Sequence, residues 1–259
     1  MTRTATAGQQ LRTPEERARS IDGALGTTMY SESGGINLWR ASQLGGPHTR
    51  VVACGEPQLA VEMPGGGWPQ GALTDLLLPS PGIGEMRLLR SALAAVAGRP
   101  VMLLQPPHRI QPAALAWWGL SAEHVRVLHA GKTADALWAA EQILRAGTTA
   151  ALIFWQNHVR PESLRRLHLA AQSSDTLFFM MRPLATASDA STAPLRLAIR
   201  PARDGVNVEF VKRRGPRRDD ALFTPLSPSP VLNVNRNASV DRRSSPVAEP
   251  RSVPAEVVA

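Results

Sequence analysis

The sequence predicts an α/β protein whose mostly parallel sheet is covered by helices on both faces. Between residues 72 and 211, short apolar runs alternate with longer segments of helical period. Runs such as 151–155 (Ala-Leu-Ile-Phe-Trp) are continuously apolar, which is typical of strands buried on both faces. Two alternating segments around Asp204-Gly205 predict a C-terminal antiparallel hairpin.

Five strands and four helices are expected before the hairpin. The strands are 73–78, 101–104, 125–128, 150–155 and 176–181, and the helices are 86–97, 112–120, 133–146 and 161–173. The hairpin pairs 195–200 with 206–211 at the edge of the sheet. Four tryptophans fall inside these elements and are expected in the core: Trp117, Trp118, Trp138 and Trp155.

The chain divides into four expected parts. Residues 1–35 are polar without a sustained period and read as flexible, and 36–54 reads as a short helical segment that packs on the core. Residues 55–215 form the core, and 216–259, rich in Pro, Ser and Arg, read as a disordered tail. A chain cut after Gly215 is therefore expected to keep its fold.

Composition excludes several classes of protein. The 259 residues carry a formal charge of +8, and no run approaches the roughly 18 apolar residues of a membrane span. The first residues lack the apolar region of a secretion signal, so we expect a cytoplasmic protein without a membrane partner. Cys54 is the single cysteine and the six histidines lack metal-ligand spacing, so no disulfide and no metal site is expected.

An altered phosphate loop follows the first strand. The pattern G-x-x-x-x-G-K-S/T binds nucleotide phosphates, but here the chain reads Pro79-Ser80-Pro81-Gly82-Ile83-Gly84-Glu85-Met86. Glu85 replaces the lysine and Met86 replaces the hydroxyl that holds magnesium, so this cofactor-binding loop is degenerate and its carboxylate is expected to repel a nucleotide. Gly131-Lys132-Thr133 has no room for a loop and reads as an ordinary helix start.

The segment from Pro64 to Gly71 (Pro-Gly-Gly-Gly-Trp-Pro-Gln-Gly), with the strand and loop after it, resembles the start of the RecA recombinase core, a P-loop NTPase fold. The likeness runs through 55–215. Where that family has its general-base glutamate this chain has Pro107, and Trp155 stands at the Walker B aspartate. The resemblance therefore implies a chain that is not an enzyme, with no catalytic residues and no cofactor.

Within this superfamily, the chain is similar to the ImuA family of translesion DNA synthesis accessory proteins. The likeness lies in Leu38-Trp39-Arg40-Ala41-Ser42-Gln43-Leu44, in 65–77, in Pro81-Gly82-Ile83-Gly84-Glu85 and in Arg160-Pro161. It implies a scaffold in SOS mutagenesis that joins the nucleoid on damage. Its partners would be an inactive Y-family-like polymerase relative and an error-prone replicative-type polymerase, with DNA, RecA and self-association as further expectations.

Two alternative functions remain open. A shorter relative of the SulA kind would inhibit cell division, and the long basic edge and tail favour the scaffold over it. An active ATPase or recombinase is disfavoured by the four replaced positions. Genes for polymerases in the same operon would support the scaffold, whereas a lone damage-induced gene would support the division inhibitor.

A basic cluster marks the end of the core. Residues 196–218 contain eight basic and two acidic side chains. Such a cluster can bind DNA phosphates, protect a sheet edge from aggregation or meet an acidic partner, and these alternatives stay open. The candidate DNA or partner contacts are Arg196, Arg200, Lys212, Arg213, Arg214, Arg217 and Arg218.

Overall fold

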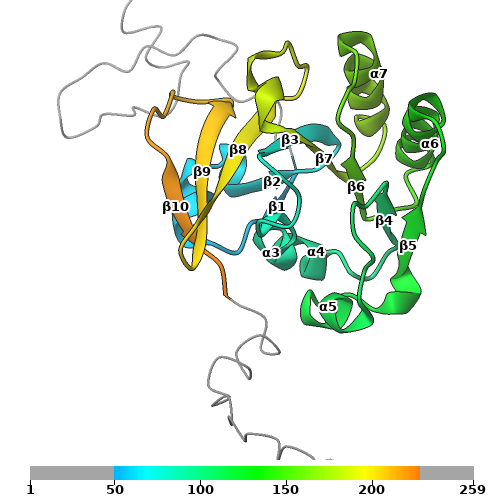
Figure 1. Ribbon diagram of the computed structural model, residues 1–259, viewed down its shortest axis with the longest axis horizontal. Coiled ribbons are helices and arrows are strands. Elements are labelled where there is room, and N and C mark those ends of the chain that lie inside the picture. Colours follow the sequence, from blue (N-terminus) through cyan, green and yellow to red (C-terminus); the bar gives the residue numbers. More distant parts are fainter. Residues whose placement is uncertain (1–49, 228–259) are drawn as a thin grey trace, which may run out of the picture. The chain divides into compact units, whose positions relative to one another are not determined.

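The computed structural model describes residues 50–227 (Figure 1). Residues 1–35, expected to be flexible, and the motif at 38–44 lie outside the described residues. Of the tail expected to be disordered, 216–259, residues 228–259 lie outside them as well. No helix in the described part is long and apolar enough to cross a membrane.

One eight-stranded sheet dominates the described chain, in the order β10-β9-β8-β3-β7-β6-β4-β5. The strands from β8 to β5 are parallel, and β9 and β10 are antiparallel to their neighbours. The fold class predicted from the sequence is therefore confirmed. The elements are β1 (Val51–Ala53), α2 (Pro57–Glu62), β2 (Gly67–Pro69), β3 (Ala72–Leu78), α3 (Glu85–Leu88), α4 (Arg90–Ala95), β4 (Val101–Leu104), α5 (Pro112–Trp117), β5 (Val125–Leu128), α6 (Thr133–Ala146), β6 (Ala151–Trp155), α7 (Pro161–Ala171), β7 (Leu177–Pro183), the 3-10 helix η3 (Leu184–Ser188), β8 (Leu195–Ala202), β9 (Gly205–Lys212) and β10 (Leu222–Pro225).

Alternate side chains of the central strands enter two separate cores. On β6, Ile153 and Trp155 pack in the core that includes α3, α4 and α5, while Leu152 and Phe154 pack against α6 and α7. Figure 1 shows α6 and α7 side by side, apart from α3 to α5. Both faces of a central strand are thus covered, which explains why its sequence is continuously apolar.

The predicted end of the core at residue 215 is wrong. Strand β10 pairs antiparallel with β9, so the β8–β9 hairpin is not the sheet edge. Leu226 is buried, and Thr224 on the inward face of β10 is buried as well. Pro225 has no amide hydrogen and is tolerated because β10 is the outermost strand.

Two smaller expectations are also wrong. Residues 51–53, placed in a helical segment by the sequence reading, form β1, which pairs antiparallel with β2. Trp138 is 62% exposed, because the buried stripe of α6 is Ala136, Leu137, Ala140 and Leu144 and residue 138 points away from it. Trp155 lies in the core as expected.

His168 on α7 ties that helix to β3. Its Nδ1 accepts a hydrogen bond of 3.3 Å from the backbone N–H of Leu73, which requires an unprotonated nitrogen. Burial lowers the pKa of His168 below its ordinary value of 6.5, and the charges of Lys212 and Arg214 lower it further. The folded protein therefore favours the neutral imidazole.

We expect this histidine to make stability fall as the pH drops below about 6.5, because the unfolded state then binds a proton that the folded state does not. Thermal melting between pH 7 and pH 5 measures the effect, which is on the order of 1 kcal/mol because one hydrogen bond to the backbone is lost. His168→Gln should flatten the pH dependence, and His129→Gln, at an exposed position, should not. If the melting temperatures of the two variants depended equally on pH, the pH dependence could not be assigned to His168.

Candidate functional site

The altered phosphate loop binds an anion that belongs to the chain itself. After β3, the loop turns through Gly82 (φ 90°) and Gly84 (φ 122°) into α3. The Glu85 carboxylate accepts hydrogen bonds from the N–H groups of Gly82 at 2.7 Å and Gly84 at 3.1 Å, and the residue is only 3% exposed. Backbone amides that converge in this way form an anion-binding concavity, here occupied by a carboxylate.

A second contact closes the loop from the C-terminal side. A Cβ added to Gly84 would come within 2.8 Å of the Leu226 side chain, so the segment after β10 packs directly on the loop. The positive φ of Gly84 independently favours glycine at this position. The loop is therefore held both by its own carboxylate and by the end of the described chain.

The other replaced positions lie beside this loop. Pro107 and Trp155 line two cavities of about 280 and 390 Å³, the first of which is bounded mainly by apolar side chains including Met86. Pro79 lines the second cavity. Among the described residues that line these cavities, Glu85 is the single carboxylate, and the loop amides already hold it.

The predicted basic cluster separates into buried and exposed members. Arg196 is buried, and its Nε lies 3.2 Å from Oδ2 of Asp75. The prediction that Arg196 contacts DNA or a partner at the surface is therefore wrong. Arg213 and Arg218 both bind the carboxylate of Glu62 on α2, and Arg213 also stacks on the Phe210 ring.

These two arginines join the C-terminal part of the chain to its start. The hydrogen bond from Arg213 and the charges of both arginines lower the pKa of Glu62, so the ion pairs persist at neutral pH. Their sequence separation from Glu62, 151 and 156 residues, explains why a charge count along the chain could not reveal this role.

The remaining members face solvent. Arg200 pairs with Glu209 at 3.0 Å and Arg217 with Asp219 at 2.8 Å, both at exposed positions where such pairs contribute little to stability. Lys212 donates to the backbone oxygen of Ser191 at 2.9 Å. Arg214 is exposed and has no ion pair within residues 50–227. These four side chains and Arg203, which is 99% exposed, are the members of the cluster that a nucleic acid could reach.

If these exposed side chains bind DNA, the logarithm of the binding constant should fall by about 0.7 to 0.9 for each tenfold rise in salt concentration and each phosphate contact. Replacing Arg200, Arg214 and Arg217 with serine should flatten the slope in a filter-binding titration. The control is an equal charge change at exposed arginines outside the cluster, Arg99, Arg145 and Arg165, which should preserve the slope. Equal slopes for both triple variants would exclude DNA as the partner of this surface.

A buried ion cluster on the α7 side of the sheet escaped the sequence analysis. Asp75 of β3 is fully buried, and its Oδ2 accepts hydrogen bonds from Ser191 Oγ at 2.7 Å and Arg196 Nε at 3.2 Å, with Arg182 at 3.5 Å. Arg196 also donates to the backbone oxygens of Thr186, Ala187 and Asp189. The cluster therefore fixes the segment that follows β7. The available signal in the sequence was Asp75, the one charged residue of strand β3.

Comparison of the sequence with models of known protein families gives no match, and comparison with curated proteins gives no significant match.

Proposed function

We propose that this chain is a non-catalytic accessory protein of error-prone translesion DNA synthesis, built on a RecA-like core that no longer handles nucleotide. The observation that supports catalytic silence most directly is the Glu85 carboxylate on the amides of the phosphate loop. A nucleotide phosphate there would lose those amides and meet a negative charge in place of a lysine. Metal-assisted hydrolysis would also need a carboxylate, and Trp155 occupies the Walker B position.

The scaffold role rests on the resemblance to the ImuA family in Pro81-Gly82-Ile83-Gly84-Glu85 and Arg160-Pro161. The proposed partners are an inactive Y-family-like polymerase relative and an error-prone replicative-type polymerase. DNA binding through the exposed basic side chains, contact with RecA and self-association belong to the same proposal. We infer a cytoplasmic protein that reaches the nucleoid after damage.

Nucleotide binding tests the first half of this proposal. Calorimetric titration of the full-length chain with ATP and Mg²⁺ should give a Kd no better than millimolar, without hydrolysis. Glu85→Lys alone should not restore hydrolysis, because Met86, Pro107 and Trp155 still lack the required oxygen atoms. DNA-stimulated ATP hydrolysis by the purified wild-type chain would contradict catalytic silence.

Mutagenesis in cells tests the second half. A deletion strain should lose mutations induced by ultraviolet light, and the wild-type gene should restore them. Affinity purification of the tagged chain after damage should recover the two polymerase-type partners. Filamentation on overproduction, with normal mutagenesis in the deletion strain, would favour the SulA-like alternative.

A further inference from the structure

The cavity of about 280 Å³ lies between the altered phosphate loop and helix α5. Its wall is mainly apolar and includes the side chains of Met86, Ile110, Ala114 and Trp118. The segment after β4 lies directly against the phosphate loop, because a Cβ added to Gly82 would come within 3.6 Å of His108 Nε2. The volume is below the range of roughly 300–1,000 Å³ typical of small-molecule sites, so the cavity suits one or two side chains of a larger partner.

Trp155, at the end of β6, brings a hydrogen-bond donor to this cavity. The residue lines the cavity and is only 9% exposed. Its indole Nε1 is buried and has no hydrogen-bond partner among residues 50–227. A buried N–H group without an acceptor is unfavourable, and native structures normally supply one. An oxygen atom of a ligand that enters the cavity would satisfy this group.

The surface around the cavity is positively charged. Residues 86–122 contain four arginines and no acidic residue, and two of these arginines, Arg87 and Arg109, line the cavity. Neither forms an ion pair within residues 50–227. Two cations beside an apolar cavity suit a few carboxylates better than the continuous phosphates of a nucleic acid. The charge therefore favours an acidic protein segment.

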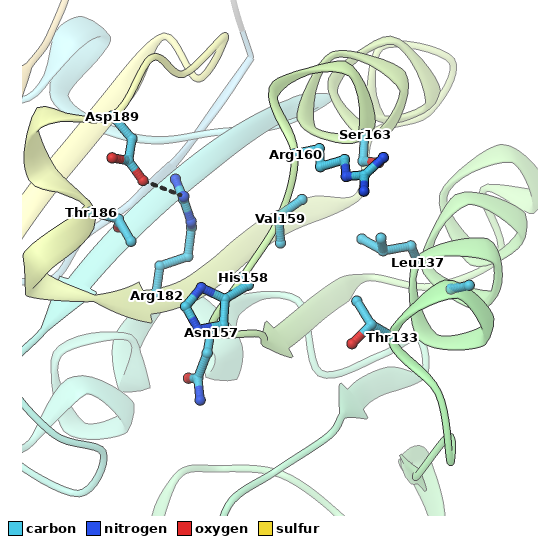
Figure 2. Close-up of a pocket in the computed structure, with 11 residues that line it drawn as sticks. Thr133, Leu137, Asn157, His158, Val159, Arg160, Ser163, Arg182, Thr186 and Asp189 are labelled. Atoms are coloured by element: carbon cyan, nitrogen blue, oxygen red, sulfur yellow. Dashed lines mark hydrogen bonds and ion pairs between the residues drawn. The ribbon is translucent and has the colours of Figure 1, made fainter.

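A third cavity, of about 390 Å³, lies where α6 and α7 begin and differs in its charges (Figure 2). Its wall includes the carboxylate of Asp189. The buried guanidinium of Arg182 is paired with Asp75 and with Asp189, and the dashed line in Figure 2 marks the second pair. The buried positive charge there is compensated within the chain, whereas the charges of Arg87 and Arg109 are not.

We propose that the cavity beside the altered phosphate loop binds an apolar side chain from an acidic segment of a partner protein. The apolar wall receives a leucine, methionine or aromatic side chain, as pockets at the centre of protein interfaces do. Carboxylates on either side of this anchor face Arg87 and Arg109. A carbonyl oxygen of the segment accepts a hydrogen bond from the indole N–H of Trp155. This site does not depend on the accessory role proposed above.

Fluorescence anisotropy with the full-length chain tests the site. The probes are short fluorescein-labelled peptides with one central leucine, methionine, phenylalanine or tryptophan, flanked either by glutamates or by lysines. At least one glutamate-flanked peptide should bind. Alanine at its centre, or lysines around the same centre, should weaken binding about tenfold or more, because the anchor or the charge complementarity is lost. A labelled single-stranded oligonucleotide is the comparison probe.

Matched variants locate the binding. Ala114→Phe should weaken it about tenfold or more, because the added ring fills the cavity, whereas Ala116→Phe adds the same ring at an exposed position of α5 outside the cavity and should change affinity less than about twofold. Arg109→Gln should weaken binding about threefold, and Arg99→Gln, exposed and outside the cavity, should not. Trp155→Phe removes the indole N–H but keeps an aromatic ring, and should weaken binding about fivefold. Thermal melting checks that each variant folds.

Binding of an acidic peptide that is lost in Ala114→Phe and kept in Ala116→Phe supports the site. Failure of every glutamate-flanked peptide to bind the full-length chain would overturn the proposal. Equal weakening by the two phenylalanine variants would overturn it too, and so would lysine-flanked peptides that bind as tightly as glutamate-flanked ones. Oligonucleotide binding that is lost in Ala114→Phe would assign the cavity to a nucleic acid and overturn its assignment to a protein partner. None of these results decides whether the chain serves translesion synthesis.

Discussion

Replacing Asp75 with alanine is expected to lower the free energy of unfolding by about 3 to 5 kcal/mol, because it leaves the buried charges of Arg182 and Arg196 without their shared carboxylate. Urea unfolding followed by circular dichroism measures the loss. Glu209→Ala removes the exposed pair with Arg200 and is the matched control, with an expected loss below about 1 kcal/mol.

A triple variant separates the cost of unpaired charge from that of altered packing. Changing Asp75 to leucine together with Arg182 and Arg196 to methionine removes all three charges, and should recover much of the stability lost by Asp75→Ala. A loss below about 1 kcal/mol in Asp75→Ala itself would mean that the ion cluster does not hold the strands in solution.

Truncation after Gly215 is expected to destabilise the protein by roughly 3 kcal/mol or more, contrary to what the sequence alone predicts. The cut removes β10 from the sheet, the buried Leu226 from its packing against the phosphate loop, and Arg218 from Glu62. A lower melting temperature in calorimetry would be the direct sign.

Truncation after Ser227 is the matched comparison, because it retains every described residue and should melt within a few degrees of the full chain. Identical melting of the two truncated forms would show that β10 adds no stability. The longer form is also the one in which to test partner capture and mutagenesis, because any loss of function there is not a loss of fold.

The sequence predicted the parallel part of the sheet well because burial on both faces leaves a continuous apolar run, as in β6. Strand β10 was missed for a physical reason. It has four residues, contains Pro225 and follows a charged stretch, and its inward side chains are recognisable only once β9 lies beside it.

The candidate site was predictable in part. The sequence showed that Glu85 stands where a phosphate loop has its lysine, and it predicted that this carboxylate repels a phosphate. It did not predict that the loop amides bind the carboxylate, because these two hydrogen bonds depend on backbone geometry that a sequence pattern does not give. Asp75 and Arg196 are 121 residues apart, so their pairing follows from the order of strands β3 and β8. Read along the chain, Arg196 looked like one more surface charge.

The Glu85 carboxylate also affects whether the shape of the loop can change with time. An ATP-driven switch changes shape because its ligand arrives, is cleaved and leaves, whereas the anion in this loop is covalently part of the chain and cannot dissociate. The loop should therefore present the same surface when cellular ATP is plentiful and when it is scarce. Under the proposed non-catalytic function, a partner that recognises this edge would respond to the amount of the protein present, so control would lie in gene expression and protein turnover.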